Sequence, residues 1–80
     1  MKNNEKIIKR IEGHKQQIDW LNENVTEAMK KVSEKIAENA ADPAYVAKWL
    51  DSWMTEVNYF NAQIAEYHKT IEILSWALED

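Results

Sequence analysis

The sequence predicts an all-α fold, an antiparallel two-helix hairpin that resembles a coiled coil, and two observations carry this prediction. The first is a run of apolar residues that recurs in alternating steps of four and three: Val46, Leu50, Trp53, Val57, Phe60, Ile64, Tyr67, Ile71, Leu74 and Leu78. This 3.5-residue spacing keeps one side of a helix against a partner helix along its whole length. The second is the scarcity of turn residues, because the 80 residues include only one glycine and one proline, too few for the turns of a sheet. We expect residues 1–80 to form a single helical-hairpin domain.

The first helix is predicted over about residues 4–39 from a second apolar series. Its members recur every seven residues: Ile11, Ile18, Val25 and Val32. Gly13 weakens this helix by about 1 kcal/mol, and Asn24 forms a loose variant of a capping box with Glu27. The alternative is a break near Asn22–Asn24, which would give three helices. The seven-residue series passes through these asparagines without a phase shift, so we favour one continuous or gently kinked helix.

The turn is predicted at residues 40–42. Asn39 can close the first helix in the left-handed conformation. Asp42 is a favourable N-cap, and Pro43 then occupies the first helical position, where its missing N–H costs nothing. The second helix therefore begins at residue 43 and is expected to continue to about residue 79. A connection this short forces the two helices to run antiparallel.

The second helix carries more apolar surface than one seam can bury. Six of its apolar residues lie outside the seam: Tyr45, Trp49, Met54, Tyr59, Ile73 and Trp76. On the first helix, Trp20 faces away from the apolar series. Exposed apolar surface usually marks an interface, and Trp and Tyr are enriched where binding energy is concentrated. We therefore predict that a partner contacts five of these residues: Trp20, Trp49, Tyr59, Ile73 and Trp76. A second copy of the chain would be the simplest partner, because two hairpins complete a four-helix bundle.

Composition and charge narrow the class of partner. The net charge of −4 leaves no basic face for nucleic acid, and no apolar run approaches the roughly 20 residues that span a bilayer. The polar side of the second helix is acidic, which anionic lipid headgroups would repel. The absence of cysteine excludes a disulfide framework and a thiolate metal site. Because the N-terminal segment also lacks the apolar core of a signal peptide, we expect a cytoplasmic protein that binds neither nucleic acid nor membranes.

No group of residues predicts catalysis, a cofactor or a metal. The serine and threonine residues are scattered over helical faces, without a turn that would present a nucleophile. A two-helix hairpin also lacks the concave pocket that a small-molecule substrate needs. His14 is expected at the level of His68, but a structural zinc site needs four ligands at recognisable spacing. Ordinary partners for these histidines are therefore favoured over a metal site or a pH-dependent switch.

The sequence thus predicts a non-catalytic protein–protein interaction module that acts by helix packing and is not an enzyme. Its partner would be another protein or a second copy in a homodimer. The alternative is a small inhibitor or immunity protein of the kind found in phages and mobile elements, which would bind and block a larger enzyme. Small size, mild acidity and outward aromatic residues suit that role as well.

Overall fold

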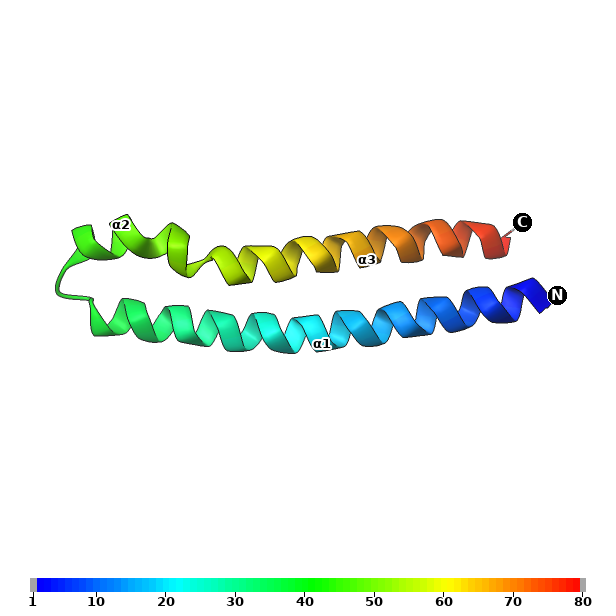
Figure 1. Cartoon of the computed structure of the whole chain (residues 1–80), viewed down its shortest axis with the longest axis horizontal. Helices are drawn as coiled ribbons and strands as arrows, with labels where there is room; N and C mark the ends of the chain where they lie inside the picture. The colour runs from blue at the N-terminus through cyan, green and yellow to red at the C-terminus, as the bar shows by residue number, and fades with distance from the viewer. Residues whose placement is uncertain (1, 80) are drawn as a thin grey trace.

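The computed structural model describes residues 2–79, with side chains over 4–78, and shows a long helical hairpin (Figure 1). The chain forms α1 (Lys2–Glu38), a turn, α2 (Pro43–Trp53) and α3 (Thr55–Glu79). The rod measures 61 × 16 × 13 Å. α2 and α3 run back along α1, so the first and last described residues lie at the end opposite the turn. No strand occurs within residues 2–79, and the predicted all-α hairpin is confirmed.

The two predicted apolar series form the contact between the helices. All ten members of the four-and-three series on α2 and α3 are buried or half-buried. Six apolar residues of the described side chains are fully buried: Ile11, Ile18, Leu21, Ala28, Val32 and Val57. α1 supplies five of these residues, α3 one and α2 none. The core is therefore a narrow strip, because two rods touch along one line.

Capping at the turn follows the prediction for Asp42 but not for Asn39. The Asp42 carboxylate accepts a hydrogen bond from the Tyr45 N–H at 3.2 Å, and Pro43 is the first residue of α2. Asn39 is not left-handed, because no described residue has a positive φ. Its side-chain Nδ2 donates instead to the Lys35 carbonyl at 2.8 Å. The carbonyls at the end of α1 are thus satisfied by the backbone N–H groups of Asn39 and Ala40 together with the Asn39 side-chain amide, rather than by a left-handed cap.

α1 passes through Asn22–Asn24 without interruption, so the three-helix alternative with a break at that place is not observed. The Asn24 Nδ2 donates to the Trp20 carbonyl at 2.9 Å, and the Thr26 hydroxyl donates to the Asn22 carbonyl at 3.0 Å. These polar side chains bond within the helix instead of ending it.

The predicted second helix over residues 43–79 is divided at Met54, which differs from the continuous helix that the sequence suggested. Met54 keeps right-handed dihedral angles of φ −83° and ψ −6°, and its N–H donates to the Leu50 carbonyl at 2.9 Å. The division is therefore a bend and not a turn. The Thr55 hydroxyl donates to the Asp51 carbonyl at 3.2 Å, and a bond of this kind to the carbonyl four residues earlier often bends a helix.

A threonine hydroxyl alone does not explain the bend. Thr26 and Thr70 make the same bond inside unbroken helices. The bend differs from those places in having two consecutive large side chains, Trp53 and Met54, that both pack on the same buried cluster. That cluster consists of Ala28, Val32 and Val57. Because a regular helix separates successive side chains by about 100°, a local change of direction helps to bring both onto one cluster.

Candidate partner-binding surface

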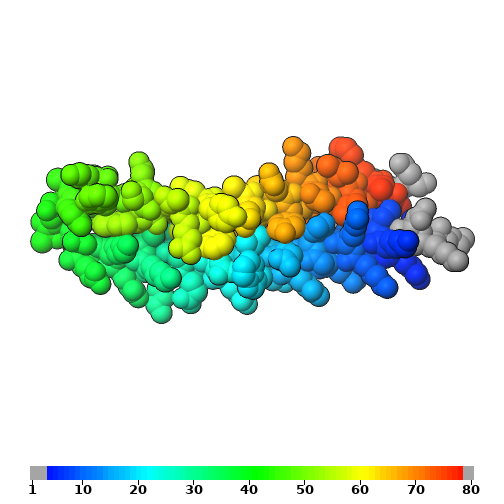
Figure 2. Space-filling view, in the orientation of Figure 1, coloured from blue at the N-terminus to red at the C-terminus, as the bar shows by residue number. Residues whose placement is uncertain are grey.

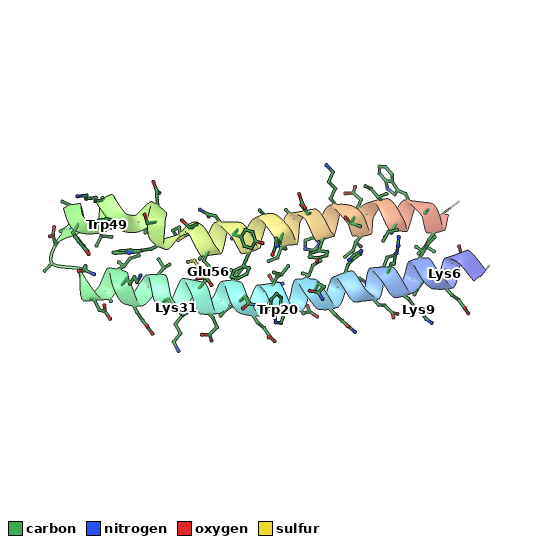
Figure 3. The ribbon with its side chains drawn as sticks, in the orientation of Figure 1. Lys6, Lys9, Trp20, Lys31, Trp49 and Glu56 are labelled. Carbon is green, nitrogen blue, oxygen red and sulfur yellow. The ribbon has the colours of Figure 1, made fainter. Side chains whose placement is uncertain are left out.

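All five residues predicted to bind a partner have exposed side chains. The exposed fractions are 56% for Trp20, 41% for Trp49, 59% for Tyr59, 56% for Ile73 and 62% for Trp76. Figure 3 shows Trp20 near the middle of α1 and Trp49 on α2, close to the turn. Large apolar side chains are usually withdrawn from water, so their gathering on a surface identifies a contact region.

Open hollows along the seam identify one side of the hairpin. Each hollow is lined by residues of both arms: Arg10 with Leu74, His14 with Gln63, and Lys31 with Glu56. On α1 the lining residues Arg10 and Lys31 are separated by a multiple of seven, and on α3 Glu56 and Gln63 are separated by seven. Residues in such a repeat keep the same position relative to the seam, so the hollows open on the same side. Figure 2 shows a continuous rod, in which side chains fill the space between the two arms.

Four of the five predicted residues lie on this side. Trp20 stands fourteen residues from both Lys6 and Glu34, which line two of the hollows. Tyr59 accepts a hydrogen bond from the Nε2 of Gln63, at 3.0 Å, and Gln63 lines the middle hollow. Ile73 follows Tyr59 by fourteen residues in the same repeat. The helical repeat therefore gathers these residues on one side although they come from both arms.

The two remaining predicted residues, Trp49 and Trp76, lie in different places. Trp49 precedes Glu56 by seven residues and so belongs to the same side, whereas Trp76 follows Ile73 by three residues and lies on the outer surface of α3. The structure thus brings four of the predicted residues to a common surface and leaves Trp76 beside it.

Tyr45 belongs to this surface although the sequence analysis did not include it among the binding residues. It is 43% exposed, and its ring centroid lies 6.4 Å from that of Trp49 and 6.2 Å from that of Trp53. Its fourteen-residue spacing from Tyr59 is the signal that could have identified it. We define the aromatic face by five residues: Trp20, Tyr45, Trp49, Tyr59 and Ile73.

Lysine side chains lie over the aromatic rings near the turn. The Lys48 Nζ lies 5.6 Å from the ring centroid of Trp49, and the Lys35 Nζ lies at the same distance from that of Trp53. A cation at this distance is attracted to the face of an indole ring. These contacts orient the tryptophans of α2 in a segment that has no buried residue.

The two histidines do not form a joint site. His14 is half-buried, and its ring stacks at a tilt of 42° on Tyr67 with 5.2 Å between the centroids. His68 is exposed and is not among the residues that line the hollow beside His14. Within the described part of the chain, no group of three or more His, Cys, Asp or Glu side chains is placed to hold a metal ion.

No helix in residues 2–79 has a segment both long and apolar enough to cross a bilayer. Comparisons of the chain with protein-family models, with curated proteins and with solved structures find no significant match. The aromatic face is therefore interpreted from its own chemistry and geometry.

Proposed function

We propose that this chain is a non-catalytic protein–protein interaction module that binds its partner through the aromatic face. The observation that carries the proposal is the placement of large apolar side chains. The hairpin fully buries only six apolar residues among its described side chains, while four aromatic side chains that are more than two-fifths exposed lie along one side of it: Trp20, Tyr45, Trp49 and Tyr59. A surface rich in Trp and Tyr has the composition of regions where binding energy is concentrated.

Helix packing is the mode of contact that this shape favours. The face is one side of a long hairpin, with open hollows between its two arms, and helices fit such grooves with their own apolar ridges. A partner that supplies two helices would convert the hairpin into a four-helix bundle and cover the aromatic rings. A second copy of the chain is the simplest source of those helices.

Affinity capture from cells of the source organism tests this proposal with three tagged baits. The first is the natural chain, and the second carries Trp20→Ala and Tyr59→Ala on the aromatic face. The third is a matched control that carries Asp19→Ala and Glu72→Ala, one exposed substitution on each arm outside the aromatic face. Circular dichroism verifies that all three baits remain helical.

The natural and control baits are expected to capture the same partner protein, and an untagged copy of the chain counts as a partner. The aromatic-face variant is expected to lose that partner. Equal recovery by all three baits would contradict a role of the aromatic face. A captured enzyme whose activity falls when the hairpin is added would favour the inhibitor alternative.

A further inference from the structure

Trp20 divides the aromatic face into two halves that differ in charge. It is the middle residue of α1, and Lys6 and Glu34 stand fourteen residues before and after it on the same side. The half near the chain ends carries two bases in its outer hollow, Lys6 and Arg10, and one acid in the middle hollow, Glu66. The half near the turn carries three acids and two bases in its hollow: Glu34, Glu38, Glu56, Lys31 and Lys35. One of those bases, Lys35, already lies over the Trp53 ring.

Apolar groups occupy both ends of the face as well as its middle. Tyr45 lies in α2 toward the turn, and Ile73 lies in α3 toward the chain ends. Figure 3 shows Trp49 near the turn and Trp20 in the middle of the rod. When a second rod is stacked on this face in the opposite direction, its apolar groups therefore meet apolar groups. Its basic half then meets the acidic half of the first rod. A surface with this property is complementary to a second copy of itself, as a two-fold interface requires.

A second hairpin can stack on the aromatic face about a two-fold axis in two ways. If both turns lie at the same end, α1 lies over the partner's α3, and Lys6 meets the apolar region near Ile73. If the two rods run in opposite directions, α1 lies over the partner's α1, and Lys6 meets the partner's Glu34. Only the second arrangement pairs Lys6 with an acid. It also brings Arg10 level with the partner's Lys31, but Lys31 shares its hollow with Glu34, Glu38 and Glu56, so acids still outnumber bases at that end and favour this orientation.

The size of the face is sufficient for a stable dimer. The long and middle extents of the rod, 61 and 16 Å, outline a side of about 1,000 Å². Stable interfaces bury about 800 Å² on each partner. A second copy stacked along the whole length therefore covers enough surface, whereas a contact restricted to one end of the rod would not.

We propose that the occupant of the aromatic face is a second copy of this chain, stacked antiparallel about a two-fold axis at Trp20 so that each Lys6 meets the partner's Glu34. This inference rests on the proposed function and specifies its partner. Each copy supplies two arms, and all neighbouring helices of the resulting four-helix bundle run in opposite directions.

Disulfide formation in the purified protein tests this arrangement, because the natural chain contains no cysteine. A variant with Lys6→Cys and Glu34→Cys places the two thiols together only across the proposed dimer, since 28 residues of helix separate them within one chain by about 42 Å. The matched control carries Glu5→Cys and Ser33→Cys, which have the same separation but lie outside the face. Mild oxidation should convert the first variant to a covalent dimer and leave the control uncrosslinked.

Sedimentation equilibrium of the natural chain supplies the independent measurement. A dimer is expected, and Trp20→Glu should weaken its association about tenfold or more, because each dimer would then hold two carboxylates at its centre. Trp76→Glu introduces the same charge outside the face and should change the association about twofold or less. Both variants replace exposed residues, and circular dichroism verifies that each stays helical.

Three results would overturn the inference. They are a monomer at every concentration, equal weakening by the two tryptophan variants, and a dimer in which the Lys6→Cys, Glu34→Cys variant does not crosslink. A monomer whose aromatic face still captures a different protein from cells would reject the second copy while leaving the proposed function in place. A monomer that captures nothing would reject both.

Discussion

α2 and α3 continue one apolar repeat, yet the hairpin buries them to different extents. Val57 at the start of α3 is 2% exposed, whereas no residue of α2 is fully buried. The seam residues of α2 are half-buried: Val46, Leu50 and Trp53. A regular repeat therefore specifies which side of a helix faces its partner, but the depth of burial depends on what the partner offers at the same level.

The opposing helix explains the difference. The seven-residue series of α1 ends at Val32, and the next inward position is occupied by Lys35, whose Nζ lies over the Trp53 ring. α3 supplies the buried Val57 to the cluster with Ala28 and Val32, whereas α2 packs on that cluster only through the half-buried Leu50 and Trp53. We infer that α2 is held by its N-cap, its aromatic contacts and the edge of this cluster, and α3 by the core.

The largest expected effect on stability comes from truncating a buried side chain of α1 in the core opposite α3. Leu21 is 2% exposed, so Leu21→Ala should lower the free energy of unfolding by about 2–5 kcal/mol, most or all of the stability of a domain this small. The matched change in α2, Leu50→Ala, should cost only about 1 kcal/mol, because Leu50 is half-buried. Urea denaturation followed by circular dichroism, at one protein concentration, measures both. Equal losses would show that α2 is packed as firmly as α3.

Removing the N-cap should affect α2 selectively. Asp42→Ala deletes the carboxylate that accepts from the Tyr45 N–H, at an expected cost of about 1 kcal/mol. Hydrogen exchange should show faster exchange of the α2 amides and little change in α3, since α2 can open without disturbing the core. Asp51→Ala, an exposed position inside α2, serves as the control and should leave exchange unchanged. Uniform acceleration across both helices would mean that they open as one unit.

The hairpin and its exposed residues could be predicted because both depend on helical periodicity alone. The series from Val46 to Leu78 identified the buried side of the second arm, and Asp42 with Pro43 identified its start. The bend at Met54 could not be predicted, because the repeat continues through it in phase. It depends on how two neighbouring side chains pack on the other arm, which a pattern within one arm does not describe.

The aromatic face was predicted residue by residue but not as a surface. Outward positions follow from each helix separately, whereas their common side depends on the pairing of the two arms. Tyr45 was missed for this reason, because its position gains meaning only beside Trp49 and Tyr59. The role of these residues in binding remains a proposal for the experiments above.

A stabilising substitution should widen the difference between the two regions. Gly13 lies inside α1, and a β-carbon added there would have no atom within 4 Å. Gly13→Ala should therefore raise the free energy of unfolding by about 0.5–1 kcal/mol and slow exchange in α1 and α3, but not in α2. Gln16→Ala, at an exposed position nearby, should have almost no effect. A lower melting temperature for Gly13→Ala would contradict this expectation.

The substitution with the smallest expected effect on stability distinguishes the two possible causes of the bend at Met54. Thr55→Val removes the hydroxyl that donates to the Asp51 carbonyl but keeps the shape of the side chain, so it should change stability by about 0.5 kcal/mol or less. If the hydroxyl competes with the backbone for that carbonyl, the amide of residue 55 becomes protected and α2 joins α3 in one helix. Thr70→Val is the control, because its hydroxyl bonds in the same way within an unbroken helix. Amide exchange over residues 54–57 reports the outcome. If the bend persists in Thr55→Val, its cause is the packing of Trp53 and Met54 on the other arm. The same packing would then explain why α2 is attached more loosely than α3.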